Sequence, residues 1–259
     1  MSDFLHSTLG RTGRPVFRLG LSGAYWPGEA ALRSGIDAGM NYLFWYYWDR
    51  QMTRVLRSVL PANREKFTVA TGVCNYAWAV RRGVDVSLRK LNTEYLDVFH
   101  VFWVGAGGLR PGVLDLLERY KQEGKIRAIA VSTHHRPLAA QLVKQGVLDV
   151  LMMRYNAAHR GAEVEIFPHL AASQPGVVSY TATRWRTLLG RPRPTAGDCY
   201  RFVLSNPNVD ACLMAPTNRA QLDQNLAALA QGPLAAEEME FMRRFGAEVR
   251  QRRFLGRKT

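Results

Sequence analysis

The sequence predicts a single (β/α)8 barrel that begins with a β-hairpin and carries an extra helix after its last strand. Eight strand-like segments alternate with eight amphipathic segments, which is the order of elements that defines this α/β fold. The chain has 259 residues, close to the ~250 typical of such barrels. A doubly wound sheet is the alternative, but the segment LGLSGAYWPG lacks the G-x-G-x-x-G spacing expected after its first strand.

The predicted strands are short runs rich in β-branched, aromatic and other apolar residues. In chain order they are LGLSGAY (19–25), MNYLFWY (40–46), FTVATGV (67–73), YLDVFHVFWV (95–104), IRAIAVST (126–133), VLMMRYN (150–156), GVVSYTA (176–182) and ACLMAP (211–216). The opening LGRTGRPVFRLGLSG combines turn residues with a strand pattern and predicts a hairpin across the barrel floor, followed by the first strand.

The predicted helices have apolar residues at i, i+3 and i+4, and several end near Gly or Asn. They are GEAALRSGIDAG (28–39), RQMTRVLRSVL (50–60), VDVSLRKLN (84–92), VLDLLERYKQEG (113–124), PLAAQLVKQG (137–146), AEVEIFPHLAAS (162–173), AGDCYRFVLSN (196–206) and RAQLDQNLAALAQ (219–231). A last helix, AAEEMEFMRRFGAEVRQRR (235–253), has no strand after it. No repeat or low-complexity linker divides residues 1–259, so we expect one domain.

Composition narrows the classes of protein to which the chain can belong. Hydrophobic residues make up 47% of the chain, which excludes general disorder, and three scattered cysteines exclude a disulfide framework. The start has no signal-peptide pattern and no apolar run approaches the ~20 residues needed to cross a bilayer, so we expect a cytoplasmic protein without membrane association. The net charge of +14 favours anionic partners such as phosphorylated cofactors.

Seven segments, in this order and spacing, resemble the aldo/keto reductases from about Leu9 to about Leu229. They are LGRTGRPVFRLGLSG, ALRSGIDAGMNYLF, SLRKLNTEYLDVFHVF, YKQEGKIRAIAVST, RYNAAHRGAE, VVSYTATRWRTLLG and VLSNPNVDACLMAPTNRAQLDQNLAAL. The resemblance implies an oxidoreductase built on the barrel, in which NADPH supplies a hydride and a tyrosine supplies a proton to a carbonyl compound. A lysine, an aspartate and a histidine assist that tyrosine.

The resemblance also places those four catalytic groups on residues of this chain. The Asp position falls on Phe44, the Tyr position on Asp49, the Lys position on Gly72 and the His position on Phe102. Phe44, Gly72 and Phe102 carry no titratable side chain, and Asp49 would donate a proton only if its pKa were raised far above the ~3.9 of a free aspartate. We therefore expect ordinary carbonyl reduction to be very weak or absent.

Three residues are candidates to replace the lost acid. Tyr46 and Tyr47 lie close to the Tyr position on an aromatic-rich strand, whose rings would otherwise simply pack. His100 should share a strand face with Phe102 and point into the barrel, and one hypothesis is that it leans into the space left by Gly72 and titrates near neutral pH. The alternative, which we favour, is a core imidazole that is hydrogen-bonded to its neighbours.

The resemblance implies an NADP(H) site in which some of the family's cofactor-binding residues are present and others are replaced. Tyr180 matches the residue that stacks on the nicotinamide, and Thr181 replaces a phosphate-binding serine. In the adenosine-binding segment APTNRAQLDQN we expect Arg219, Gln221 and Asn225 to contact the cofactor, with Thr217 there as a further contact or only as a helix cap. Ser132-Thr133 stands where the family has Ser-Asn, and Met152 where it has Gln. A Met cannot make the two directed hydrogen bonds of that Gln, so cofactor affinity should be reduced.

The sequence leaves three classes of function open. One is a divergent NADP(H)-linked oxidoreductase, and another is a pseudoenzyme that binds NADP(H) or a small molecule as a sensor or partner-binding module. Aromatic residues on the second to fourth strands favour a small aromatic or carbonyl ligand. A nucleic-acid partner, suggested by the basic segment MRRFGAEVRQRRFLGRKT, is disfavoured because such helices usually present a solvated face. The pair His134-His135 lacks a third ligand at a recognisable spacing, so we expect no metal site.

Overall fold

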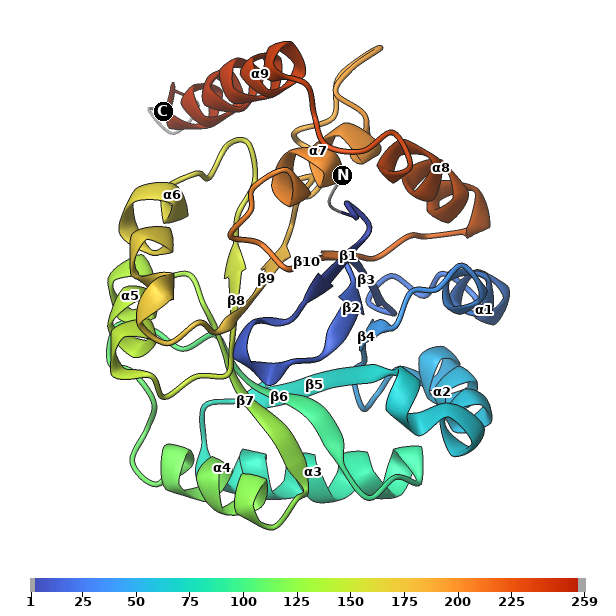
Figure 1. Cartoon of the computed structure of the whole chain (residues 1–259), viewed down its shortest axis with the longest axis vertical. Helices are drawn as coiled ribbons and strands as arrows, with labels where there is room; N and C mark the ends of the chain where they lie inside the picture. Colours follow the sequence, from blue (N-terminus) through green and yellow to red (C-terminus); the bar gives the residue numbers. More distant parts are fainter. Residues whose placement is uncertain (1–2, 256–259) are drawn as a thin grey trace.

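A computed structural model describes residues 3–255 and contains a closed ring of eight parallel strands (Figure 1). The strands follow each other around the ring in the order β10-β3-β4-β5-β6-β7-β8-β9. Their bounds are β3 Leu19–Ser22, β4 Tyr42–Phe44, β5 Thr68–Cys74, β6 Leu96–Phe102, β7 Ile126–Thr133, β8 Val150–Arg154, β9 Gly176–Tyr180 and β10 Ala211–Met214. The predicted (β/α)8 barrel is thus confirmed, although most strands end two or three residues earlier than the sequence patterns indicate.

Helices cover the outside of the ring, as expected for this fold. They are α1 Glu29–Asp37, α2 Arg50–Asn63, α3 Ala77–Leu91, α4 Val113–Gln122, α5 Arg136–Gln145, α6 Ala162–Glu165, α7 Ala196–Leu204, α8 Arg219–Leu229 and α9 Ala236–Leu255. The helix predicted over 162–173 divides into α6 and the 3-10 helix η3 (Phe167–Ala172), since Pro168 lacks the N–H that a continuing helix would use. The helix predicted over 84–92 begins earlier, at Ala77.

A short hairpin closes the floor of the barrel, as predicted. Strand β1 (His6–Thr8) pairs antiparallel with β2 (Pro15–Phe17), and the 3-10 helix η1 (Gly10–Thr12) lies in the connection. Gly10 has φ +44°, and a Cβ there would lie 2.2 Å from the backbone nitrogen of Gly176, so only glycine permits this close approach. The hairpin thereby buries Leu9 and Val16 in the barrel interior.

Two apolar layers hold the barrel together. The larger layer fills the space between the strands and the helices. The smaller one fills the inside of the ring, where aromatic rings from β4 and β6 face small side chains from the other strands; its members include Tyr42, Phe44, Ala70, Phe102, Ala128, Ala130 and Ala211. This alternation of large and small residues lets the interior pack without a pore.

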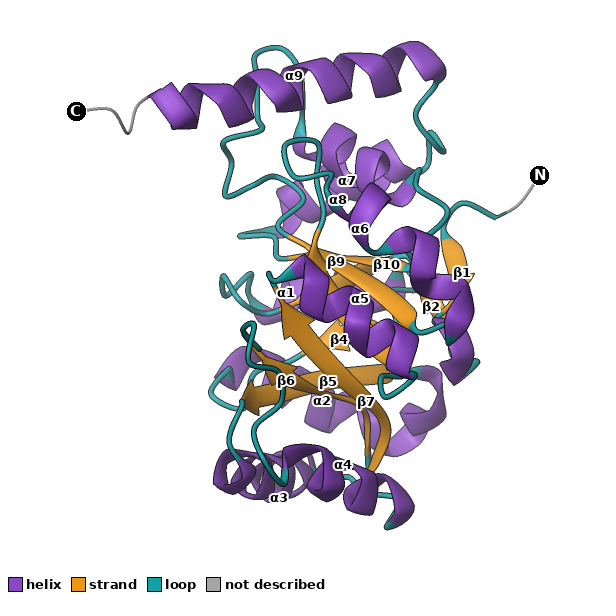
Figure 2. Ribbon diagram, turned by 90° about the vertical axis from the view of Figure 1, so that its left-hand side faces the viewer, coloured by secondary structure: helices purple, strands orange, loops and turns teal. Residues whose placement is uncertain are grey.

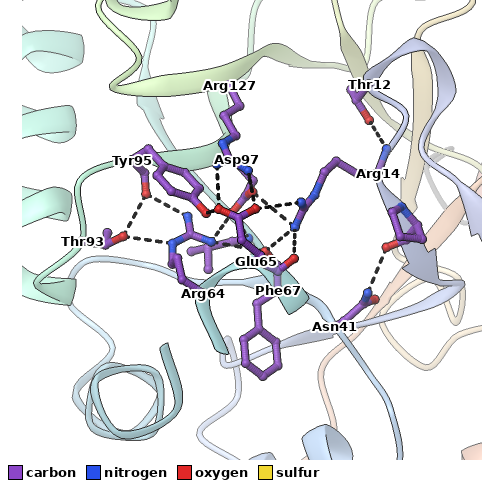
Figure 3. A network of polar contacts seen from close by, with 12 residues as sticks. Thr12, Arg14, Asn41, Arg64, Glu65, Phe67, Thr93, Tyr95, Asp97 and Arg127 are labelled. Atoms are coloured by element: carbon purple, nitrogen blue, oxygen red, sulfur yellow. Dashed lines mark hydrogen bonds and ion pairs between the residues drawn. The ribbon is translucent and has the colours of Figure 1, made fainter. Parts of the chain in front are cut away.

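Charged side chains gather at the floor around two carboxylates (Figure 3). Buried Asp97 accepts the Val69 N–H at 2.9 Å and forms an ion pair with Arg64 at 2.8 Å. Glu65 accepts hydrogen bonds from Arg127 and from the Tyr95 hydroxyl. The guanidinium groups of Arg64 and Arg127 lie 3.8 and 3.6 Å from the centre of the Tyr95 ring. The network thereby joins β5, β6, β7 and the end of α2.

The extra helix α9 lies beyond α7 at one end of the molecule (Figure 2). It rests on the segment after β8, because a Cβ on Gly246 would lie 2.3 Å from the backbone of Ala157. Buried Arg184 donates a hydrogen bond to the Val249 carbonyl, which adds a polar contact between α9 and the loop after β9. Within residues 3–255, no helix is both long and apolar enough to cross a membrane.

Replacing Asp97 by alanine tests whether the floor network stabilises the barrel. The change would remove the buried carboxylate that pairs with the Arg64 guanidinium and accepts the Val69 N–H, so we expect Asp97→Ala to lower the free energy of unfolding by about 3 kcal/mol. Urea unfolding followed by circular dichroism measures this value. Asp115→Ala, which removes an exposed carboxylate from α4, is the control. An equal, small loss in both variants would contradict a structural role for the network.

Candidate functional site

The mouth of the barrel, formed by the carboxyl ends of the strands, contains a cavity of about 190 Å³. In barrels of this type, ligand sites lie at this end because the loops that follow the strands meet there. The residues that line the cavity come mainly from the ends of β3, β4, β9 and β10 and the loops after them; they are Ser22, Ala24, Tyr25, Phe44, Tyr46, Tyr180, Thr181, Ala182, Thr183, Trp185, Tyr200, Leu213, Met214 and Ala215. We refer to it as the mouth cavity.

Two of the four positions assigned to catalytic groups hold packed phenyl rings. Phe44 ends β4 and Phe102 ends β6, and both rings are buried in the interior layer. Their centres lie 5.9 Å apart, and the Phe44 ring also meets Tyr46 edge to face at 5.2 Å. Phe44 and Phe102 therefore contribute apolar contacts at this end of the barrel, and neither can exchange a proton.

The third position, Gly72, leaves no empty space for a neighbouring side chain. It pairs with His100 across β5 and β6, and a Cβ on Gly72 would lie 2.2 Å from the His100 carbonyl oxygen. The hypothesis that His100 leans into a void beside Gly72 is therefore wrong. The backbone of β6 itself occupies that space, so the absent side chain permits close approach of the two strands.

His100 is a buried, neutral residue of the barrel interior. Its ring stacks on Phe102 at 6.0 Å and meets Phe44 at 5.6 Å, and within the described part of the chain neither ring nitrogen has a hydrogen-bond partner. Burial lowers the pKa of His100 to about 3. The hypothesis of titration near neutral pH is therefore wrong. The favoured interpretation, a core imidazole, is confirmed in the burial of the ring but not in its hydrogen bonds, which are missing among the described residues.

The fourth position holds Asp49, which caps the start of helix α2. The Asp49 Oδ1 atom accepts the Met52 N–H at 3.0 Å at the start of α2, which satisfies one of the unpaired donors of that helix. Burial raises the pKa of Asp49, in the direction a proton donor would need, while the bond from Met52 opposes the shift. The residue is 2% exposed and does not line the mouth cavity, however, so it cannot reach a ligand bound there.

The two candidate tyrosines lie in different places. Tyr46 lines the mouth cavity, where its ring stacks on Trp48 at 4.8 Å, and burial raises the pKa of its hydroxyl. Tyr47 is exposed and lines a separate cavity beside α3. Of the two, only Tyr46 can contact a ligand in the mouth cavity.

Tyr180 ends β9 and presents its ring to the mouth cavity. Its hydroxyl lies 3.1 Å from a ring nitrogen of His134 and also forms a hydrogen bond with Ser132. Burial raises the pKa of Tyr180 to about 12 and lowers that of His134, so both groups are neutral at pH 7. The adjacent His135 caps α5, because its Nδ1 atom accepts the Leu138 N–H.

The other residues predicted near the nicotinamide make mostly internal contacts. The Thr133 hydroxyl donates to the Val104 carbonyl, and Met152 is buried in the interior layer. Thr181 lines the mouth cavity with φ +58°, and its hydroxyl donates to the Tyr180 carbonyl. The structure thus brings only Tyr180 and Thr181 of this group to the cavity surface.

The loop before α8 supplies an exposed helix start. Asn218 caps the helix by accepting the Gln221 N–H, and the Gln221 side chain accepts the Thr217 N–H, so the expectation that Thr217 caps α8 is wrong. Arg219 is exposed and forms an ion pair with Asp223 at 3.2 Å. Asn225 is buried, and its amide contacts the Met214 sulfur. Thr217, Arg219 and Gln221 are accessible to an anion, whereas Asn225 supports the loop from below.

Sequence reasoning missed several residues of the mouth cavity. Tyr25, Trp185 and Tyr200 line it from the loop after β3, the loop after β9 and helix α7. Trp185 is exposed and has φ +51°, a conformation that a large side chain rarely adopts. The available signal was an aromatic residue at or just after the end of a predicted strand, as for Tyr25 and Trp185, but the direction of such a side chain depends on loop geometry that residue types do not encode.

The mouth cavity is aromatic and uncharged. Among the residues that the structure describes, no Lys, Arg, Asp, Glu or His lines it. Four tyrosines and several small polar groups provide neutral hydrogen-bond donors and acceptors, which can orient a flat ligand. Chemically, the cavity offers no cation that would lower the pKa of a tyrosine and no carboxylate paired with such a cation.

Comparisons with known proteins support the resemblance to the aldo/keto reductases. Residues 32–195 match the sequence profile of the Aldo/keto reductase family. Methylglyoxal reductase YeaE of Escherichia coli is 29% identical over 168 residues, which span 59% of this chain and 56% of that enzyme. L-galactose dehydrogenase of Arabidopsis thaliana is 23% identical over 281 aligned positions, covering 86% of this chain and 87% of the plant protein.

Solved structures share the same fold. The holo form of an aldo-keto reductase from Bacillus halodurans superposes with a TM-score of 0.81 at 20% identity, covering 93% of this chain and 95% of the other. An aldo/keto reductase from Klebsiella pneumoniae, determined with NADP and acetate, superposes with a TM-score of 0.78 at 22% identity, covering 94% and 95%. At these identities the superpositions establish the barrel architecture.

The pH dependence of stability tests the buried state of His100. Its folded pKa of about 3 lies below the ordinary 6.5, so only the unfolded chain takes up a proton as the pH falls between these values. We expect stability to fall over this range about 1.4 kcal/mol per pH unit more steeply in the wild type than in His100→Leu. Urea unfolding at a series of pH values measures the two slopes.

The same pair of proteins at higher pH provides the control for this prediction. Above about pH 7.5 a histidine is neutral in both the folded and the unfolded chain, so the two proteins should respond to pH in parallel there. Equal slopes below pH 6.5 as well would show that the His100 ring accepts a proton in the folded barrel.

Proposed function

Because the chain belongs to the aldo/keto reductase family, we propose that it binds NADP(H) at the barrel mouth and reduces ordinary carbonyl compounds very weakly or not at all. The observation that carries this proposal is the uncharged mouth cavity, in which the family's proton-donating machinery has no counterpart. The relative named as a methylglyoxal reductase supports a carbonyl compound as the substrate class of any remaining activity.

The residues at the mouth fit part of an NADP(H) molecule. The Tyr180 ring forms one wall of a cavity large enough for a nicotinamide ring, and Thr181 lies next to it. The accessible start of α8 offers backbone N–H groups, the positive end of a helix dipole and Arg219 to the adenosine phosphates. Met152 and Ser132 offer little to the nicotinamide amide, since the first is buried and the second is bonded to Tyr180. We therefore propose a weakened site.

Bound NADPH would supply the hydride, so the protein has to orient the carbonyl and deliver a proton. Tyr46 is the hydroxyl best placed to do both, because it lines the mouth cavity together with Tyr180 and is close enough to interact with it electrostatically. Burial raises the pKa of Tyr46, and no lysine lines the cavity to lower it. A tyrosine in this state is a poor acid at neutral pH, which explains the weak reduction that we propose.

A sensor or partner-binding role is the second candidate. The same uncharged cavity favours it, because a family member that holds its cofactor without consuming it needs no proton donor. Tight NADPH binding without turnover would support this role, whereas tight binding with turnover would support the oxidoreductase.

Titration of NADPH and NADH by cofactor fluorescence tests the binding site. Arg219 is the accessible cation at the start of α8, so we expect Arg219→Gln to weaken NADPH binding about tenfold and leave NADH binding unchanged. Arg50→Gln is the control, since Arg50 is an exposed arginine at the first position of another helix, α2. Equal loss for both cofactors, or an equal effect of Arg50→Gln, would contradict this assignment.

Steady-state assays with a panel of aldehydes and quinones test the weak chemistry. We expect turnover well below about 1 s⁻¹ with NADPH, under the range of ordinary enzymes. Any residual turnover should be abolished by Tyr46→Phe and retained in Tyr47→Phe, because Tyr47 lies outside the mouth cavity. Turnover at or above about 1 s⁻¹ would overturn the proposal, and residual activity that survives Tyr46→Phe would remove that residue from the mechanism.

A further inference from the structure

A second and larger cavity, of about 510 Å³, lies beside the barrel mouth. It is enclosed by the end of β5, one face of α3, the loop after β4 and the end of β6. We call it the lateral cavity. It shares no lining residue with the mouth cavity, although Gly72 and Phe102, two of the four positions assigned to catalytic groups, contribute to its lining.

Three exposed tryptophans form the walls of the lateral cavity. Trp48, Trp78 and Trp103 are 53%, 64% and 70% exposed, and all three line it. Indole rings bury large areas when they find a partner, so a cluster of exposed ones around a cavity marks a surface suited to a flat apolar ligand. The base between these walls is also apolar, with Val73 from β5 and Val86 from α3.

Cations border the same cavity on one side. Arg82, Arg89 and Lys90 lie on the face of α3 that lines it, together with Gly83 and Val86 one turn apart. Among the described residues no carboxylate lines the cavity, and neither Arg82 nor Arg89 forms an ion pair with one. Lys90 donates a hydrogen bond to the Tyr47 carbonyl at 2.6 Å and thereby fixes the loop after β4.

We propose that the lateral cavity binds a planar aromatic anion, a small ring system that carries a carboxylate. The ring lies between the indoles of Trp78 and Trp103, and the carboxylate faces Arg82 and Arg89. The volume lies within the range typical of small-molecule sites. Guanidinium groups are the side chains best matched to a carboxylate, because they donate two parallel hydrogen bonds to it. The site requires neither NADP(H) nor turnover and so goes beyond the proposed function.

Isothermal titration calorimetry with naphthoate, and with naphthylmethanol as its uncharged counterpart, tests the proposal on the full chain. We expect one naphthoate to bind per chain and naphthylmethanol to bind at least about tenfold more weakly, because the alcohol cannot use the arginines. Equal affinity for the two compounds, or no heat from naphthoate up to its solubility limit, would overturn the proposal.

Matched variants locate the bound compound. The double variant Arg82→Gln/Arg89→Gln should weaken naphthoate about tenfold, whereas Arg81→Gln, an exposed arginine of the same helix outside the cavity, should not. Trp78→Ala should weaken both compounds, whereas Trp185→Ala, an exposed indole of the mouth cavity, should leave both unchanged. Weakening by Trp185→Ala in place of Trp78→Ala would place the ligand in the mouth and contradict the proposal.

Cys74 provides a chemical readout at the site itself. It lines the lateral cavity and is half-buried, while Cys199 and Cys212, the other two cysteines of the chain, are buried. Iodoacetamide should therefore alkylate Cys74 selectively in the folded protein, and saturating naphthoate should slow that reaction severalfold. An unchanged alkylation rate at saturation would show that the ligand binds elsewhere.

Discussion

The closed ring of eight parallel strands fixes a narrow interior that side chains have to fill, and much of the molecule follows from this constraint. Phe44, His100 and Phe102 fill it near the mouth, opposite the small residues of the other strands. A lysine and aspartate pair at the same level would have to be desolvated, which is costly unless each charge is fully paired. The aromatic packing and the absence of charge near the mouth therefore have the same cause, because the rings fill the space in which a charged pair would have to be desolvated.

The two ends of the barrel differ in the arrangement of their charged side chains. At the floor, Asp97 and Glu65 are surrounded by arginines, and Arg11 and Lys121 pair with Asp149 nearby. These ion pairs connect the hairpin, the segment after α2, α4, the strands β6 and β7 and the loop before β8, and they need no ligand to satisfy them. At the mouth, polar groups are neutral, and the free cations lie to the side on α3. The described part of the chain thus joins its floor with ion pairs and presents arginines without a carboxylate partner at the lateral cavity.

The sequence could predict the barrel because the order of strands and helices and the position of the opening hairpin follow from periodicity and turn residues. It could not predict the sides to which neighbouring aromatic residues turn. Strand β4 ends at Phe44, two residues before the apolar run ends, and this separates Tyr46 from Tyr47. The close approach at Gly72 depends on its register with His100, and the choice of Asn218 as cap depends on loop dihedrals. Residue types alone specify neither the register of the strands nor the dihedral angles of the loop.

The distribution of tryptophans has an optical consequence. Trp45 is buried, and its indole N–H donates to Thr53, whereas the other five indoles are exposed in the folded chain. Emission from the native protein is thus dominated by hydrated rings and already resembles that of an unfolded chain. The spectrum will change little when the barrel melts. It will respond strongly when something covers the indoles around the lateral cavity, which makes this protein's own fluorescence a reporter of its surface.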